Sequence, residues 1–405
     1  MADRPPLRFR LSAMAPRDAD EEHRAATPLE LFFDLVFVIA VSIAASNLHH
    51  SFADGHGPSG LQTYLFAFFA IWWGWMNFTW FATSFANDDW LYRVLTFIQM
   101  GGVLVLAAGI DLAFSEQNFV LLVSGYVVMR ISMVALWLRA SRRAGELRES
   151  TFIYAIGISS AQVLWVLWLL VPQSPWSVAM VLALIAAELA VPVIAERKAS
   201  TPWHPHHITE RYGLFTIIVL GESLLASANA IIEALHAGED LAELIALAVL
   251  TLVVTASLWW IYFWPPHHRE ISTLARSLRY GYGHYVVLAA AATVSVGVEV
   301  GIDAITGETA MSEVAASLVI AIPVAIFILA IWWIALRESA DRTVNIAVPT
   351  AALLVLLDPV LPIPIAITSI VLVALVVLLV RHPPLDRSDE RGHITGDDRP
   401  VSTPE

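Results

Sequence analysis

Residues 27–42 read TPLELFFDLVFVIAVS, and this stretch decides the class of fold. Thr27 and Pro28 are typical of a helix start, and an unbroken apolar run follows them. Glu30 and Asp34 nevertheless lie one turn apart on one face of the predicted helix. Because a carboxylate is costly in a membrane-like segment, each of these two acids needs an explanation.

The composition of the whole chain is that of a polytopic membrane protein. Of its 405 residues, 58% are hydrophobic and 15% are charged, whereas about 25% are charged in a typical soluble domain. The absence of cysteine excludes disulfides and thiolate chemistry. The net charge of −13, with few and scattered basic residues, argues against nucleic acid as a partner. The expected partner is the lipid bilayer, and no cofactor is expected.

Long apolar segments predict an all-α bundle of about twelve transmembrane helices, since about 20 apolar residues cross a bilayer. The last two segments are separated by three prolines, so residues 343–381 form either two spans or a re-entrant pair. The predicted spans are 29–49, 61–84, 92–112, 118–138, 152–171, 176–195, 212–235, 242–264, 281–302, 313–336, 343–357 and 362–381.

The basic residues predict the orientation of the bundle. With the N-terminus in the cytosol, all 23 Lys and Arg except Arg130 fall at cytosolic ends or loops, as the positive-inside rule requires. Residues 1–27 lack the apolar core and cleavage site of a signal peptide and are expected to be a cytosolic tail. Residues 382–405 are polar and proline-rich, and a disordered cytosolic tail is expected there.

The chain also shows signs of a parallel internal repeat, with one six-helix half at 28–200 and another at 201–381. The offsets between matching features grow steadily along the chain, as loop insertions would make them. Equal span numbers give the halves the same orientation, as in some transporters. The matching features include Glu30 with Glu210, Trp72-Trp73 with Trp259-Trp260, and Asp111 with Asp303.

Three acids inside the predicted spans are candidate functional groups. An acid in a first helical turn favours the positive end of the helix dipole, which suits Glu30. Asp34 lies about 6 Å deeper, so capping explains it less well. Glu222 lies eleven residues beyond Arg211, about 16 Å along the helix and near the membrane midplane. We expect Glu222 to line a functional site, with a structural hydrogen bond as the alternative.

Arg130 is the one cation away from the predicted interfaces. A buried arginine needs an acid, and Asp34, Glu188 and Glu222 are the buried acids available. Arg130 and Glu188 therefore form either part of a transport path or a structural ion pair between helices.

Polar and aromatic side chains supply further candidates. Tyr282 and His284 begin the ninth span, where a histidine can relay protons or simply be hydrogen-bonded. The run WWGWMNFTW at 72–80 is denser in tryptophan than an interfacial belt requires. It is a candidate lining for a pore or for a groove that contacts lipid.

His206, His207 and Glu210 are candidate ligands of a metal ion. A histidine and Glu210 share one helical face only if the helix begins before Thr209, and the prolines at 202 and 205 argue against that start.

Three segments together resemble the bacterial low temperature requirement A (LtrA) family. They are ELFFDLVFVIAVS at 30–42, WWGWMNFTWFATSFANDDWLYRVLTFIQMGGVLVLAAGI at 72–110 and ERYGLFTIIVLGES at 210–223. The resemblance extends from Thr27 to Arg381. It implies a multi-pass protein of the bacterial plasma membrane, named for a cold-growth phenotype, without a settled substrate. The motif positions carried over are Glu30, Asp34, Asp88, Asp89, Arg93, Arg130, Glu210, Arg211, Glu222 and His284, with Asp88, Asp89, Arg93 and Arg211 at the cytosolic side.

Charge near the midplane without a familiar catalytic motif favours transport. We expect an ion or small solute to cross through a carboxylate-lined path between the halves, with Asp34 and Glu222 coordinating a cation or carrying protons. One alternative is an intramembrane enzyme that acts on a lipid through Glu210, Glu222 and nearby histidines. The other is a structural or sensor protein whose buried charges only hold helices together.

Overall fold

The computed structural model describes residues 11–18, 21, 24–172, 174–237, 241–309, 311–360 and 365–385. Over these ranges the chain is helical, as predicted, and contains no strand. Most of the two predicted tails, including 1–10 and 386–405, lies outside the described residues. The helices are α1 (Pro28–Ala53), α2 (Gly57–Phe85), α3 (Trp90–Ala108), α4 (Ile110–Ser115), α5 (Val120–Ala140), α6 (Arg148–Trp168), α7 (Ser177–Glu196), α8 (Pro205–Ala237), α9 (Ala242–Phe263), α10 (Leu274–Thr306), α11 (Glu313–Ile331), α12 (Arg342–Leu357) and α13 (Ala366–Arg381). Four short turns, η1 (Gly145–Leu147), η2 (His267–Glu270), η3 (Trp332–Leu336) and η4 (Asp358–Val360), complete the described elements.

Ten helical stretches within the described residues are long and apolar enough to cross a membrane. The set omits α2 and α13. Helix α13 has only 16 residues, whereas α2 has 29 residues but carries four tryptophans, which lower its mean hydropathy. Helices α8 and α10 begin at residues 205 and 274, seven residues before the predicted spans at 212 and 281.

Local sequence explains where several helices begin. Thr27 and Glu30 form a capping box at α1, in which each side chain binds the backbone N–H of the other residue. Asp89 caps α3 and Asp341 caps α12. Each carboxylate accepts a hydrogen bond from the backbone N–H three residues further along the chain. Pro205 begins α8, where its missing N–H costs nothing because the first turn has no intrahelical partner.

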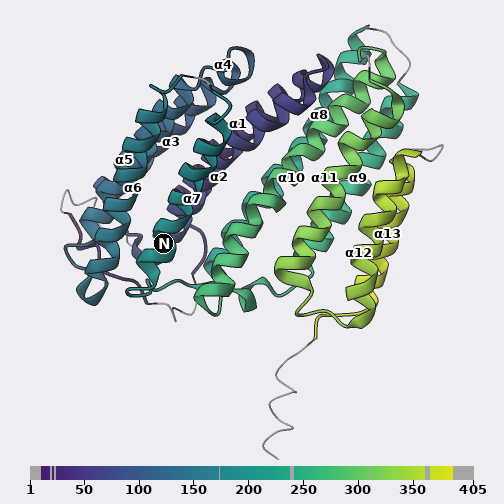
Figure 1. Cartoon of the computed structure of the whole chain (residues 1–405). Helices are drawn as coiled ribbons and strands as arrows, with labels where there is room; N and C mark the ends of the chain where they lie inside the picture. Colours follow the sequence, from purple (N-terminus) through teal and green to yellow (C-terminus); the bar gives the residue numbers. More distant parts are fainter. Residues whose placement is uncertain are drawn as a thin grey trace, which may run out of the picture.

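Helix α1 lies at the junction of two groups of helices (Figure 1). It packs against α2 and α3 on one side and against α8 and α10 on the other. In the first group, α3 packs on α5, α5 on α6 and α6 on α7. In the second, α8 packs on α9 and α10, α10 on α11, α11 on α12 and α12 on α13. The seam between the groups therefore consists of α1 and α2 against α8 and α10.

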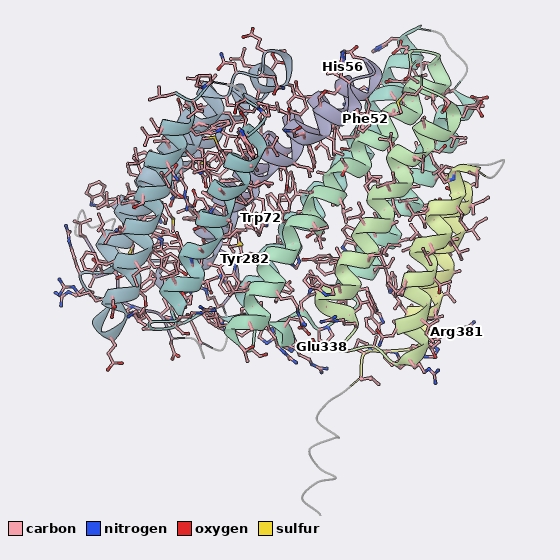
Figure 2. All side chains as sticks on the ribbon, viewed as in Figure 1. Phe52, His56, Trp72, Tyr282, Glu338 and Arg381 are labelled. Atoms are coloured by element: carbon pink, nitrogen blue, oxygen red, sulfur yellow. The ribbon has the colours of Figure 1, made fainter. Side chains whose placement is uncertain are left out.

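We name the two ends of the bundle after residues of α1, the Thr27 end and the His49 end. In Figure 2, Glu338 marks the Thr27 end and His56 marks the His49 end. The side chains of Trp72 and Tyr282 meet between these ends, at the seam (Figure 2).

Candidate functional site

The two acids of α1 meet two basic residues of α8 in the buried seam. Glu30 Oε1 lies 3.2 Å from His207 Nε2 and 3.3 Å from an Arg211 nitrogen. The Arg211 guanidinium also binds Asp34 through two nitrogens, with Nε 3.1 Å from Oδ2. All four side chains have an exposed fraction of 1% or less. Both pairs are spaced by four residues, so two acids on one helix face two bases on the other.

Asp34 is held further by the aromatic wall of α2. Trp75 Nε1 donates to Asp34 Oδ1 at 2.6 Å, and the Arg211 guanidinium lies over the Trp75 ring at 6.0 Å from its centre. Asp34 is therefore fully paired, and the arrangement ties α1, α2 and α8 together. It offers no free carboxylate oxygen to a passing cation.

The early start of α8 creates this contact and corrects the expected helix boundary. Because the helix begins at Pro205, His207 already lies on the helical face of Arg211 and points into the seam. His206 and Glu210 are exposed instead, and the Glu210 carboxylate accepts from the Ala26 backbone N–H at 3.2 Å. His206 and Glu210 therefore share the exposed face of α8, whereas His207 faces the seam. Among the described residues, no group of three or more His, Cys, Asp or Glu suits a metal ion.

Arg130 and Glu188 form a second buried contact, inside the first group of helices. Arg130 Nη2 donates to Glu188 Oε2 at 3.1 Å. The carboxylate also accepts from Trp73, Tyr126 and Gln162, each at 3.0 Å. Four donors from α2, α5 and α6 therefore satisfy one acid of α7, which is the pattern of a structural clamp.

Glu222 lies apart from both of these contacts. It is half-buried on α8 and interacts electrostatically with Glu299 of α10. Towards the His49 end, His49 of α1 bridges two acids of α10, with Nε2 2.7 Å from Asp303 and Nδ1 3.3 Å from Glu299. Each ring nitrogen of His49 therefore faces a carboxylate of α10. Asp34, Arg130 and Glu222 thus belong to three separate contacts.

His284 belongs to a network of paired rings near the Thr27 end. Its Nδ1 donates to the Tyr280 carbonyl at 2.8 Å, so Nε2 accepts from the Tyr262 hydroxyl at 3.0 Å. His267 is arranged alike: Nε2 donates to the Tyr262 carbonyl at 2.6 Å and Nδ1 accepts from Tyr280 at 3.2 Å. Burial lowers the pKa of His267 to about 4. Burial therefore favours the neutral form of His267, and the hydrogen bonds to carbonyls orient both rings.

The acids that follow α2 are also accounted for by local structure. Asp89 caps α3 and binds Arg139 of α5, with Oδ1 2.9 Å from Nη1. Burial opposes the charge, but hydrogen bonds from Arg139 and two backbone N–H groups lower the pKa of Asp89 below its ordinary value. Asp88 and Arg93 form an exposed pair at 2.7 Å. These contacts of Asp88, Asp89 and Arg93 do not involve Arg211 of the seam.

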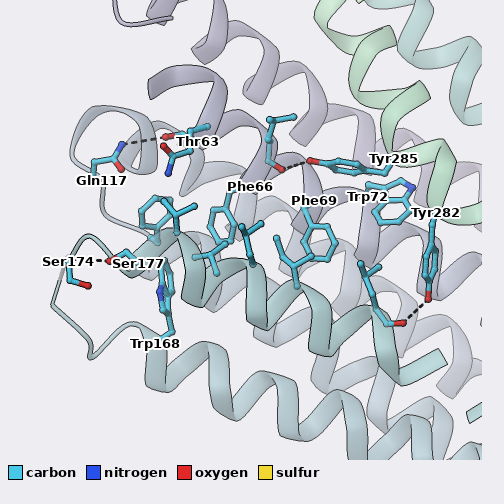
Figure 3. Close-up of a pocket in the computed structure, with 18 residues that line it drawn as sticks. Thr63, Phe66, Phe69, Trp72, Gln117, Trp168, Ser174, Ser177, Tyr282 and Tyr285 are labelled. Carbon is cyan, nitrogen blue, oxygen red and sulfur yellow. Dashed lines mark hydrogen bonds between the residues drawn. The ribbon is translucent and has the colours of Figure 1, made fainter. Parts of the chain in front are cut away.

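A cavity of about 530 Å³ lies between α2, α7 and α10. Figure 3 shows amide and hydroxyl side chains at one end of it, aromatic rings along its walls, and Tyr282 at the other end. The polar end is formed by Gln62, Thr63, Gln117, Ser174 and Ser177, and the walls include Phe66, Phe69, Trp72 and Trp168. The described residues of the lining include no Asp, Glu, His, Lys or Arg.

Tyr282 separates this cavity from a smaller hollow nearer the Thr27 end. Tyr282 lines both, and its hydroxyl donates to the Leu189 carbonyl at 2.8 Å. The smaller hollow, about 40 Å³, is lined by polar side chains that include Asn77, Glu196 and Ser277. Glu196 accepts from the Tyr154 hydroxyl at 2.8 Å. The two hollows therefore meet at the ring of Tyr282.

Comparison with known proteins places the chain in a family. The family model described as bacterial low temperature requirement A protein (LtrA) matches residues 25–381. The chain belongs to the LtrA family. It is also 29% identical over 263 residues to "Uncharacterized protein RA0937" of Rhizobium meliloti (strain 1021). That match covers 61% of the chain and 60% of the relative's length. No solved structure matches significantly.

Family membership and the apolar helices together identify a multi-pass integral membrane protein. Two segments that resemble the LtrA family, ELFFDL at 30–35 and ERYGLF at 210–215, meet in the seam. The first supplies Glu30 and Asp34, and the second supplies Arg211. The residues that sequence reasoning missed are His49, Glu299, Glu196 and the cavity lining. Glu299 and Asp303 repeat the four-residue spacing of the α1 acids, which is the signal that points to them.

Proposed function

We propose that this LtrA protein moves a small solute across the membrane through the hollows between α2, α7 and α10. The observation that carries the proposal is the pair of hollows that share Tyr282 in their linings, one nearer each end of the bundle. A transporter needs a binding space that communicates with one side at a time, and a single ring between two hollows supplies the barrier. The lining of the larger cavity, without carboxylate or imidazole, supports a transporter more than a lipid-modifying enzyme.

This route differs from a carboxylate-lined one. Asp34 and Glu188 are each paired with an arginine and saturated by hydrogen bonds, which supports a structural role for them. Among the acids that the sequence singles out inside spans, Glu222 is the one that is half-buried. We therefore assign the solute to the aromatic cavity and keep Glu222 as a candidate for proton movement beside it.

Twelve spans in two parallel six-helix halves form part of the proposal. The order of helix packing supports it: α1 on α2 corresponds to α8 on α9, and α1 on α3 to α8 on α10. In the same way, the packing of α3 on α5 corresponds to that of α10 on α11, α5 on α6 to α11 on α12, and α6 on α7 to α12 on α13. On this scheme α2 is the counterpart of α9, and α13 the counterpart of α7.

The echoed side chains, however, occupy different surroundings. Trp72 and Trp73 are buried, whereas Trp259 and Trp260 are 43% and 44% exposed. The repeat, as we propose it, preserves helix packing and not the functional groups. We further propose that the Thr27 end faces the cytosol of a bacterial plasma membrane, which fits the position of the basic residues.

Side-specific cysteine labelling tests the route, because the natural chain contains no cysteine. Ser177→Cys lies in the larger cavity and Ser277→Cys in the smaller hollow. In sealed vesicles of either orientation, a membrane-impermeant maleimide should label each cysteine from one side only, and from opposite sides. Adding Tyr282→Ala should open Ser277→Cys to reagent from the Ser177 side.

The matched control is Ser159→Cys on the exposed outer face of α6, which should stay unlabelled because it faces lipid. If Ser177→Cys and Ser277→Cys react no faster than this control, no aqueous route exists. If Tyr282→Ala leaves the sidedness unchanged, Tyr282 is not the barrier and the proposal fails.

A further inference from the structure

The larger cavity has a polar end and an apolar body, and this division identifies its ligand. Amide and hydroxyl groups gather at the His49 end, where Gln117 Nε2 lies 3.4 Å from the Thr63 hydroxyl (Figure 3). From Thr63 to Trp72 the wall of α2 runs nine residues, about 13.5 Å at 1.5 Å per residue. Over that distance the lining includes Leu65, Phe66 and Phe69 of α2 and apolar side chains of α7.

The cavity also carries no charged side chain that would bind an ionic headgroup. A phosphate or carboxylate head would find no basic side chain to pair with among the described lining residues. Amides and hydroxyls can instead donate to and accept from the hydroxyl groups of a neutral head. A volume of about 530 Å³ falls within the usual range for small-molecule sites.

Gln117 supplies a second, independent observation at the polar end. Its backbone φ is +54°, a left-handed conformation that a non-glycine residue adopts only at a cost. The surrounding bonds hold it there, since Nε2 donates to the Ala113 carbonyl at 3.2 Å. The amide is thereby fixed beside Thr63 at the cavity mouth.

We propose that this cavity binds a neutral, single-chain lipid whose hydroxyl-bearing head lies among Gln62, Thr63, Gln117 and Ser177, and whose chain lies along Phe66, Phe69 and Trp72. The proposal rests on the proposed function in that the same cavity serves as the solute site. It names the class of solute: a single acyl or alkyl chain with an uncharged polyol head, as in a monoacylglycerol.

Photocrosslinking to purified protein in detergent tests this assignment. The probe is a monoacylglycerol with a diazirine in its acyl chain, and crosslinked peptides are identified by mass spectrometry. We expect crosslinks in 61–72 of α2 and 177–189 of α7. Unlabelled monoacylglycerol should compete, whereas the fatty acid of the same chain length and phosphatidylglycerol should not.

Two variants make the test specific. Val181→Trp fills the cavity and should reduce these crosslinks at least tenfold, whereas Val163→Trp, on the exposed face of α6, should leave them unchanged. Gln117→Leu removes one head contact and should weaken competition about fivefold, the usual effect of one neutral hydrogen bond.

Crosslinks spread over all exposed helices and insensitive to Val181→Trp would overturn the assignment, as would equal competition by the fatty acid. The result is separable from the transport test. Side-specific labelling without the expected crosslinks would refute the ligand class alone. The expected crosslinks without side-specific labelling would refute transport and leave a lipid-binding site.

Discussion

Replacing Arg211 with methionine should destabilise the protein in a pH-dependent way. In the folded protein the Arg211 guanidinium supplies two hydrogen bonds to Asp34 and lies 3.3 Å from Glu30. Without it, Asp34 keeps only the Trp75 donor in a fully buried position. The buried carboxyl must then be either charged and unpaired or protonated. Because it can always take up a proton, the free energy of protonation is an upper limit on the loss of stability.

That limit follows from the ordinary behaviour of aspartate. Protonating an aspartate whose pKa is about 3.9 costs about 4 kcal/mol at pH 7 and about 1.5 kcal/mol at pH 5. We therefore expect Arg211→Met to lower the free energy of unfolding by about 4 kcal/mol at pH 7. The loss agrees with the 3–5 kcal/mol, roughly, that breaking a buried pair costs in other proteins. Because the penalty is the work of adding a proton, it shrinks as the pH falls toward 5.

The free energy of unfolding can be measured by dodecyl sulfate titration in mixed micelles, followed by tryptophan fluorescence at pH 7 and pH 5. The control is Arg142→Met, which removes an exposed arginine and should change stability by less than about 0.5 kcal/mol. The double variant Asp34→Asn with Arg211→Met should lose the pH dependence. If Arg211→Met matches the control at pH 7, or costs as much at pH 5, the buried pairing described for the seam is wrong.

Three further results are expected from the same measurement. Arg130→Met should cost about 3–5 kcal/mol, because the saturated Glu188 carboxylate would lose its only cation; a loss below about 1 kcal/mol would refute the clamp. His267, whose pKa burial lowers to about 4 from an ordinary value near 6.5, binds fewer protons when folded than when unfolded. Stability should therefore fall as the pH drops from 6.5 to 4, and His267→Gln should flatten that fall. Gly102→Ala should destabilise, because the new Cβ would lie 2.8 Å from a backbone oxygen of α5, whereas Gly101→Ala has open space and should not; equal effects would contradict the close α3–α5 contact.

Sequence patterns predicted the parts of the structure that depend on local chemistry. The helix start at Thr27 and Pro28 is confirmed, and Glu30 lies in the first turn of α1, where it forms a capping box with Thr27. Arg130 did require a buried acid, and Glu188 was among the three named. The all-helical fold and LtrA membership are also confirmed.

The remaining features depend on contacts between distant segments, which no local pattern specifies. Arg211 was interpreted as a boundary residue from the distribution of basic residues, and the prolines suggested that the helix starts no earlier than Thr209; one of them, Pro205, begins the helix instead. Arg211 proves to be buried as the partner of Asp34, which no local pattern indicated. The cavity was indicated only by Tyr282, which lines both hollows, and by the tryptophan-rich run at 72–80, of which Trp72 lines the larger cavity and Asn77 the smaller hollow.

The facing pairs of α1 and α8 also limit how the two groups of helices can move. Each pair is spaced by four residues, so sliding one helix past the other by a turn, about 6 Å, would leave an acid and a base without partners. Both ion contacts would have to break at once inside an apolar core, which opposes an elevator-like displacement. A rocking motion about the Asp34–Arg211 contact keeps the charges together while it alters the spacing at Tyr282. The ion pairs would then act as the pivot of the cycle, and the aromatic cavity as the part that opens and closes.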